Sequence, residues 1–228
     1  MIAITCRGVT RRYTDTGGEP VMAVDQVDLD VRPGEFVAIQ GPSGSGKTTL
    51  LGLLAGLEQA DEGTVTVAGH DLARLTATER ARLRREQIGI VLQTFGLVAS
   101  LDAGENVGLP LRLAGISRAD QAARVAEVLE EVGLGGRGNA RIDELSGGER
   151  QRVAVARALA IAPSVILADE PTGSLDDTTA AGILVLLSEA VRRRGAGLLL
   201  VTHDPASAAL ADREYAMRDG RIVERVAS

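Results

Sequence analysis

The segment from Gly41 to Thr48 constrains the fold of this chain more than any other. It reads Gly-Pro-Ser-Gly-Ser-Gly-Lys-Thr and has the spacing G-x-x-x-x-G-K-[ST]. The sequence predicts a buried strand directly before it, over residues 35–40, and a helix after it, over residues 46–56. Glycines let successive backbone N–H groups turn inward around an anion, and the helix directs the positive end of its dipole at the same point. The segment therefore predicts a strand–loop–helix unit that binds phosphate groups.

The same loop carries Lys47, the only lysine among the 25 basic residues. The Lys47 ammonium is expected to contact the β- and γ-phosphates of a nucleoside triphosphate, and the Thr48 hydroxyl to bind Mg²⁺. The predicted nucleotide site comprises the whole loop: Gly41, Pro42, Ser43, Gly44, Ser45, Gly46, Lys47, Thr48 and Thr49.

A second element indicates hydrolysis. The apolar run Val165–Ala168 is followed by two acids, Asp169 and Glu170. A carboxylate at the carboxyl end of a strand beside a phosphate loop can hold Mg²⁺ through water, and this role is expected for Asp169. Glu170 is the candidate general base that orients the attacking water.

The pattern along the chain divides into a strand-rich first part, a helical middle over residues 101–160 and a return to strands at 164–168 and 197–202. A helix is predicted between the last two strands, over residues 176–194. Strand–helix–strand order predicts a parallel α/β core, and the helical middle reads as an inserted subdomain. The helix after the phosphate loop is expected to bury five leucines: Leu50, Leu51, Leu53, Leu54 and Leu57.

Composition excludes several classes of function. The net charge of −6 and the aromatic content of 2% disfavour nucleic-acid binding. No apolar run approaches the roughly 18 residues of a membrane helix, so no direct membrane insertion is expected. Cys6, the only cysteine, is expected to be a small buried hydrophobe in a strand, and the N-terminus lacks a signal-peptide pattern. These features predict a cytoplasmic protein.

Two arginine clusters, at residues 80–85 and 192–194, are interpreted as solvated helix faces, with a minor role in docking a partner as the alternative.

The run Leu145–Arg152 moves the interpretation toward one family. It reads Leu-Ser-Gly-Gly-Glu-Arg-Gln-Arg, opens a predicted helix and precedes the acidic strand end by about 25 residues. It resembles the signature motif of ATP-binding cassette (ABC) ATPases. The resemblance implies that Ser146, Gly147, Gly148 and Glu149 contact the γ-phosphate of ATP bound on a second subunit.

Further positions are similar to the family pattern in the same order. Tyr13 matches the aromatic that stacks on adenine. Gln93 matches the glutamine that contacts the metal or the attacking water and links to the helical subdomain. Residues 174–176 match the loop that crosses the dimer interface, and His203 matches the histidine that senses the γ-phosphate.

The resemblance implies a single ABC ATPase domain over residues 1–228. Its P-loop NTPase core, with a parallel sheet and an N-terminal antiparallel β part, is expected over about 1–93 and 161–228, and its helical subdomain over about 94–160. The implied reaction is ATP + H₂O → ADP + phosphate. Two copies would close around two Mg-ATP, and an integral-membrane permease subunit would hold the protein at the inner face of the cell membrane.

Within the family, the chain is similar to the branch for lipoprotein release, macrolide export and cell division. The features are Leu-Ser-Gly-Gly-Glu at 145–149, Asp-Glu-Pro-Thr-Gly at 169–173 and Glu-Asn-Val at 105–107. The segment 94–100, which faces the membrane partner in this family, departs from the polar or aromatic pattern expected there. Export or extrusion of lipoprotein or peptide is therefore the first interpretation. The alternative is an ATPase of a cell-division or mechanical signalling complex that moves no solute. A chromosome or translation ATPase is disfavoured, since a coiled coil or second cassette does not fit in 228 residues.

Overall fold

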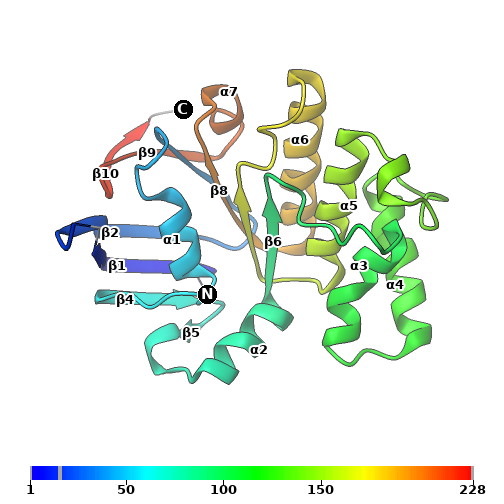
Figure 1. Ribbon diagram of the computed structural model, residues 1–228, viewed down its shortest axis with the longest axis horizontal. Helices are drawn as coiled ribbons and strands as arrows, with labels where there is room; N and C mark the ends of the chain where they lie inside the picture. Colours follow the sequence, from blue (N-terminus) through cyan, green and yellow to red (C-terminus); the bar gives the residue numbers. More distant parts are fainter. Residues whose placement is uncertain (1, 15–16, 227–228) are drawn as a thin grey trace.

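The computed structural model describes residues 2–14 and 17–226, and its described strands form two sheets (Figure 1). An antiparallel sheet has the order β2-β1-β4-β5, and a six-stranded sheet has the order β10-β9-β3-β8-β7-β6. In the six-stranded sheet all neighbours are parallel except β9 and β10. The strands are β1 (Ile4–Thr14), β2 (Pro20–Val31), β3 (Phe36–Gln40), β4 (Glu62–Val67), β5 (His70–Asp71), β6 (Ile88–Leu92), β7 (Val165–Asp169), β8 (Gly197–Thr202), β9 (Arg213–Arg218) and β10 (Arg221–Val226).

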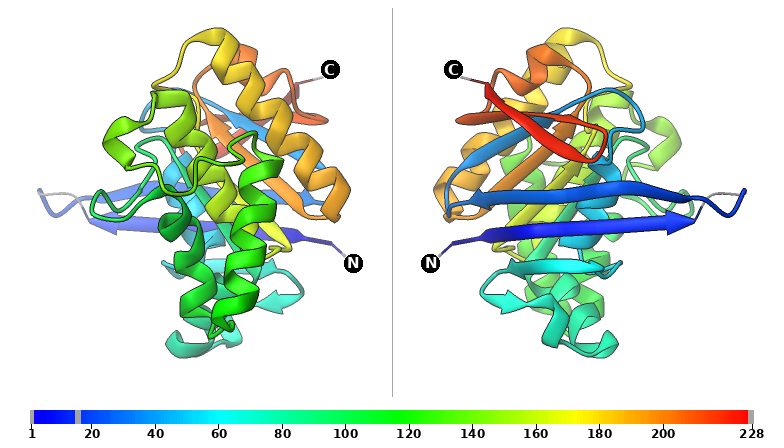
Figure 2. Two further views of the ribbon diagram at one scale, coloured as in Figure 1. Left: turned by 90° about the vertical axis from the view of Figure 1, so that its right-hand side faces the viewer. Right: turned by 90° about the vertical axis from the view of Figure 1, so that its left-hand side faces the viewer.

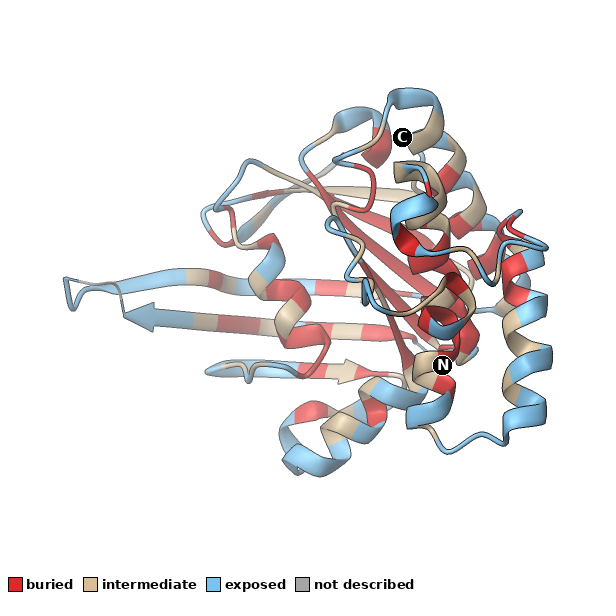
Figure 3. Ribbon diagram, turned by 45° about the vertical axis from the view of Figure 1, so that its right-hand side comes forward, coloured by how far each residue is buried: buried red, intermediate tan, exposed pale blue. Residues whose placement is uncertain are grey.

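The central parallel strands β3, β7 and β8 are apolar up to their last residue because both faces of their sheet are covered. Side chains alternate between faces along a strand. Leu198 and Leu200 of β8 accordingly join one buried cluster, whereas Leu199 and Val201 join the other. Figure 3 shows the resulting band of buried residues through the centre of the molecule.

One face of the parallel sheet packs against α1 (Lys47–Leu54) and the antiparallel sheet. Four of the five leucines predicted to pack from this helix are buried, but Leu57 is 64% exposed. The prediction for Leu57 is wrong because the helix ends at Leu54 and the chain turns away at Gly56, which has a φ of 62°. The neighbouring α2 (Ala77–Gln87) follows the short helix η1 (Leu72–Arg74).

The other face packs against the helical middle of the chain (Figure 1). The longer helices on this face, the last of which follows β7, each begin at a side chain that accepts a backbone N–H, namely Asp102, Ser117, Ser146 and Asp176. These helices are α3 (Ala103–Leu113), α4 (Arg118–Glu131), α5 (Gly147–Ala160) and α6 (Asp177–Arg194), accompanied by the shorter η2 (Ile142–Glu144) and α7 (Pro205–Ala208). The predicted parallel core, antiparallel β part and helical insertion are thus confirmed.

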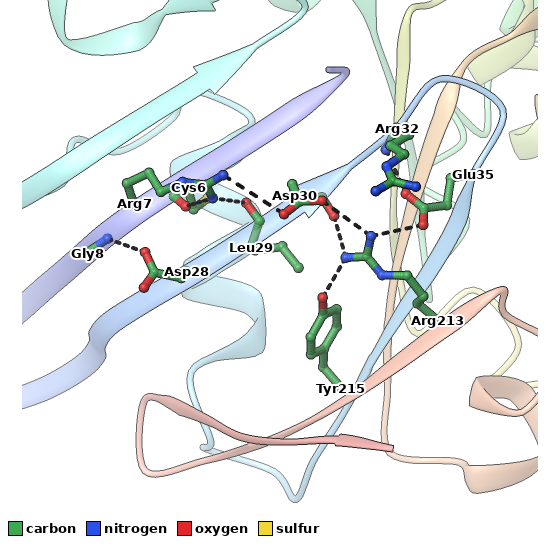
Figure 4. A network of polar contacts seen from close by, with 10 residues as sticks. All are labelled: Cys6, Arg7, Gly8, Asp28, Leu29, Asp30, Arg32, Glu35, Arg213 and Tyr215. Atoms are coloured by element: carbon green, nitrogen blue, oxygen red, sulfur yellow. Dashed lines mark hydrogen bonds and ion pairs between the residues drawn. The ribbon is translucent and has the colours of Figure 1, made fainter. Parts of the chain in front are cut away.

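The antiparallel sheet carries a long hairpin of β1 and β2 that extends beyond the rest of the molecule (Figure 2). A polar network joins this hairpin to β9 (Figure 4), because Arg213 donates to the Glu35 carboxylate at 3.0 Å and to the Asp30 carbonyl at 2.9 Å. Cys6 is fully buried beside it, and burial raises the pKa of its thiol to about 12. The prediction that Cys6 is a buried hydrophobe is confirmed.

Among the helices of residues 2–14 and 17–226, none has the length and apolar character needed to cross a bilayer.

Candidate functional site

The carboxyl ends of β3, β7 and β8 open on a cavity of about 760 Å³. Parallel strands bring their carboxyl ends to one edge of the sheet, so the loops that follow them meet there. The residues that line the cavity come from these loops, from β1 and β2, and from the end of β6: Tyr13, Val21, Met22, Ala23, Pro42, Ser43, Gly44, Gly46, Lys47, Thr48, Thr49, Gln93, Asp169, Glu170 and His203.

Two glycines of the phosphate loop are required by close backbone approaches. A Cβ at Gly41 would lie 2.3 Å from the carbonyl oxygen of Met217, and one at Gly46 would lie 2.1 Å from that of Ala23. Gly46 also has a φ of 102°, which side-chain-bearing residues rarely adopt, and it caps the start of α1. The loop is therefore pressed against β2 and β9, with its other side open to the cavity. Gly41 and Ser45, both predicted site residues, lie on the side of the loop that faces away from the cavity and do not line it.

Lys47 is only 7% exposed and is folded back into its own loop. Its Nζ donates to the carbonyl oxygens of Gly41 at 2.7 Å and Pro42 at 2.8 Å. Burial lowers the pKa of Lys47, although the charges of Glu170 and Asp169 oppose this effect. The ammonium is thus satisfied by carbonyl oxygens of its own loop.

Asp169 and Thr48 form an oxygen-rich pair beside the loop. The Thr48 hydroxyl donates to Oδ2 of Asp169 at 3.4 Å. Burial and then the charge of Glu170 raise the pKa of Asp169 above its ordinary value. Carboxylate and hydroxyl oxygens are ligands that suit Mg²⁺, and a cation here would favour the ionised form of Asp169.

Glu170 is held on both of its oxygens. Its Oε1 lies 2.9 Å from Nδ1 of His203, and its Oε2 accepts a hydrogen bond of 3.1 Å from the hydroxyl of Thr202. Glu170 has a left-handed φ of 46°, a conformation that a side-chain-bearing residue keeps only when its surroundings fix it. Thr202 is 1% exposed and was not recognised in the sequence, where it reads as the last residue of a buried strand.

Gln93 reaches the same cavity from the neighbouring strand. β6 pairs in parallel with β7 so that Leu92 lies opposite Asp169, which brings Gln93 beside Glu170. The side-chain amide of Gln93 rests against Gly173, where a Cβ would lie 2.7 Å from its Nε2. The fixed strand register and this contact together place the amide at the cavity.

Tyr13 lies at the rim of the cavity, where β1 ends. Its hydroxyl donates to the carboxylate of Glu58, and the guanidinium carbon of Arg11 lies 4.8 Å from its ring centroid. Residues 21–23 of β2 complete this part of the lining. Residues 21–23 are brought to Tyr13 by the pairing of β1 with β2, and no sequence motif marks them. Glu58 comes from the segment between α1 and β4, whereas Arg11 lies two residues before Tyr13 on the same face of β1.

The signature residues lie elsewhere. Ser146 caps α5, accepting the N–H of Glu149 at 3.2 Å, while the Glu149 carboxylate accepts the N–H of Ser146 at 2.9 Å. A Cβ at Gly148 would lie 2.7 Å from a methyl carbon of Thr179. None of Ser146, Gly147, Gly148 and Glu149 lines the cavity, and α5 packs on the face of the parallel sheet opposite α1.

A glycine-rich loop that leads from a buried strand into a helix, with a buried lysine and two acids at the end of another parallel strand of the same sheet, defines a P-loop ATPase. The family model described as ABC transporter matches residues 24–173. The chain belongs to the ABC transporter family, as its ATP-hydrolysing, nucleotide-binding subunit.

Relatives are similar over most of the chain. The lipoprotein-releasing system ATP-binding protein LolD of Chromohalobacter salexigens is 46% identical over 98% of this chain and 94% of its own length. The macrolide export ATP-binding/permease protein MacB 1 of Aeromonas hydrophila is 45% identical over 95% of this chain, which spans 33% of that protein. Among solved structures, the dimeric ATP-binding cassette MJ0796 in a post-hydrolysis state with ADP and Pi has a TM-score of 0.88 and 37% identity, covering 98% of this chain and 97% of that one.

Proposed function

We propose that two copies of this chain close around two Mg-ATP and drive a separate membrane-spanning partner in lipoprotein release or a related export step. The observation that carries the proposal is the position of the signature residues. Ser146 to Glu149 are exposed or half-exposed at the start of α5 but do not line the cavity of their own chain. A second copy is the source of such residues for each cavity, and the relative MJ0796 is described as a dimer.

Within each cavity, the phosphate loop and Lys47 would bind the triphosphate, and Tyr13 would stack on adenine. Glu170 would orient the attacking water as general base, while His203 and Gln93 would contact the γ-phosphate and the water. Thr48, Asp169 and Gln93 would hold Mg²⁺, which offsets phosphate charge when it is bound.

The helical part of the chain supplies the proposed contact with the membrane partner. We place its limits at about residues 94–160, between Gln93 and β7. A groove of about 510 Å³ runs along its junction with α2 and β6 and is lined by Leu92, Pro110 and Leu113 together with arginines. Leu113 is 64% exposed, so the groove presents apolar surface that a partner segment can cover. Docking there would hold the chain at the inner face of the membrane.

Affinity purification of the tagged chain from detergent-solubilised membranes tests the proposal. We expect an integral-membrane protein with several predicted spans to co-purify and to stimulate Mg-dependent ATP hydrolysis. A matched variant, Leu113→Asp, should keep basal hydrolysis and lose the membrane protein, because a carboxylate would enter the apolar groove. A wild-type chain that hydrolyses ATP but recovers only proteins without membrane spans would contradict the proposed partner. A translocation assay with the purified complex then separates export from a mechanical complex that moves no solute.

A further inference from the structure

The loop that follows Gln93 has a strained backbone that needs external support. Phe95 has a φ of 60° and Gly96 a φ of 59°, both in the left-handed region. A bulky residue such as phenylalanine is disfavoured in this region and keeps the conformation only where neighbouring groups fix it. The internal hydrogen bonds of the loop run from Phe95 N–H to the Leu92 carbonyl and from Gly96 N–H to the Thr94 carbonyl. The carbonyl oxygens of Phe95 and Gly96 accept neither of these bonds and need donors from another element.

The support comes from α5. The guanidinium of Arg157 donates to the carbonyl of Gly96 and, at 2.9 Å, to that of Phe95. No carboxylate pairs with Arg157 in the described part of the chain, and burial lowers the pKa of its guanidinium. Its polar interactions among these residues are therefore directed to the loop.

A second arginine of the same helix contacts the loop two turns earlier. The guanidinium carbon of Arg150 lies 5.6 Å from the ring centroid of Phe95, within the range of a cation–π contact. Seven residues separate Arg150 from Arg157, so both project from one face of α5. The helix that begins at Ser146 therefore holds Phe95 by its ring and by its carbonyl.

We propose that Arg157, supported by the contact of Arg150 with Phe95, is a positioning residue that sets the place of Gln93 in the hydrolytic site. Gln93 lies two residues before Phe95, and its amide is confined by Gly173 on the cavity side. The inference rests on the proposed role of Gln93 toward the metal or the attacking water. The inference gives α5 two functions. The helix carries the signature residues at its start, and through Arg157 it anchors the loop that follows Gln93 in its own chain.

A matched control exists on the neighbouring helix α4. Arg124 of α4 also donates to two adjacent backbone carbonyls, those of Ala160 at 2.9 Å and Leu159 at 3.0 Å, at the carboxyl end of α5. Arg124 and Arg157 thus make the same kind of bidentate contact with main-chain carbonyls, but only Arg157 touches the glutamine loop. Loss of either one should lower thermal stability by a similar amount.

The test compares Arg157→Met, Arg124→Met, Gln93→Ala and the double variant Gln93→Ala/Arg157→Met in steady-state ATP hydrolysis. We expect Arg157→Met to lower kcat about tenfold to a hundredfold, since a displacement near 1 Å in a positioning group has this effect. Its KM for ATP should stay within about twofold of the parental value, because the phosphate loop and Tyr13 are untouched. Arg124→Met should keep the parental kcat. In the Gln93→Ala background, Arg157→Met should cause no further loss.

Two results would overturn the inference and leave the proposed role of Gln93 intact. Equal kcat values for Arg157→Met and Arg124→Met would show that Arg157 contributes only to the stability of the fold. A full multiplicative loss in the double variant would show that Arg157 does not act through Gln93. A Gln93→Ala variant with the parental kcat would instead refute the proposed role of Gln93, and this inference with it. Arg157→Lys replaces Arg157→Met if the latter fails to fold; a lysine can reach one of the two carbonyls, so partial recovery of kcat is expected.

Discussion

The buried hydroxyl of Thr202 donates a hydrogen bond of 3.1 Å to the carboxylate of Glu170. The same hydroxyl oxygen accepts the N–H of Asp204 at 3.0 Å through a lone pair, while its single proton is donated to Glu170. The Glu170 side chain is thereby held on both oxygens, with His203 on the second one.

Thr202→Val keeps the shape of the side chain and removes this hydrogen bond. We expect kcat for ATP hydrolysis to fall about tenfold, since a hydrogen bond to a charged group contributes roughly 1.5–3 kcal/mol and each 1.4 kcal/mol is a factor of ten in rate. ATP affinity, measured by equilibrium binding, should be unchanged. Thr202→Ser should restore the rate, and a valine variant with the parental kcat would remove Thr202 from the positioning of Glu170.

Glu170→Gln should separate binding from hydrolysis. The amide keeps the volume of the side chain but cannot accept a proton from water, whereas Lys47 and the loop still bind the triphosphate. With Mg-ATP the variant should elute from a sizing column as a dimer and return to a monomer when ATP is removed. Adding Ser146→Arg should abolish the dimer, because a bulky side chain would occupy the γ-phosphate position of the partner. Hydrolysis by Glu170→Gln at the parental rate would exclude Glu170 as the base.

Asp169→Asn should stabilise the nucleotide-free protein while abolishing Mg-dependent hydrolysis. Burial and the charge of Glu170 raise the pKa of Asp169 in the folded state, so its ionised form is less favourable there than in the unfolded chain. This destabilisation is absent below the ordinary value of 3.8, grows as the pH rises toward the raised pKa, and is complete above it. Thermal unfolding as a function of pH should therefore show a higher Tm for the variant at neutral pH, with the difference shrinking in acid. A lower Tm of the variant at neutral pH would contradict the predicted destabilisation by the ionised Asp169 carboxylate.

Gly173→Ala should impair hydrolysis with little effect on stability. The new Cβ would meet only the far end of the Gln93 side chain, which can move aside, but the amide would then leave its place at the cavity. We expect a several-fold lower kcat and a Tm close to that of the parent. Gly182→Ala in α6, where the nearest atom would be 3.9 Å away, serves as control and should keep the parental kcat.

Tyr13→Ala should weaken ATP binding by about 1–3 kcal/mol, the usual contribution of one aromatic–base stack. Tyr13→Phe keeps the ring face and loses only the hydrogen bond to the half-buried Glu58, so most of the affinity should remain. Equilibrium titration with a fluorescent ATP analogue measures both variants. Equal losses for Phe and Ala would mean that Tyr13 acts through its hydroxyl and does not stack.

The predictable part of the site was the part encoded in short segments. The phosphate loop, Asp169 and Glu170 could be identified because each lies at a strand end within a few residues of its own signal, and Gln93 and His203 followed from the family pattern. Contacts set by strand register or helix packing could not be read this way. Thr202 on Glu170, Glu58 on Tyr13 and Arg157 on Phe95 join residues 32, 45 and 62 positions apart.

The same limit explains the errors. In the two arginine clusters, Arg82, Arg85, Arg192 and Arg193 are exposed, as a solvated helix face requires. Arg84 and Arg194 are half-buried instead: Arg84 donates to the carbonyl of Gly56 at 2.7 Å and Arg194 to that of Leu159 at 3.2 Å. The helical period of the arginines gives no sign of these acceptors, because the acceptors are main-chain atoms of other elements. Similarly, the leucine pattern after the phosphate loop continues to Leu57 although the helix has already ended.

The burial of Cys6 makes the folded chain inert toward thiol reagents. With no exposed surface and a pKa of about 12, this sulfur is neither reachable nor ionised near neutral pH. A cysteine introduced at an exposed position such as Asp177, at the start of α6, would therefore be the sole reactive thiol without any background substitution. Lys47 offers a second, independent labelling site, since its amine is the only one on a side chain and is held inside the phosphate loop. The rate at which an amine reagent labels Lys47 therefore reports whether the phosphate loop is open or occupied.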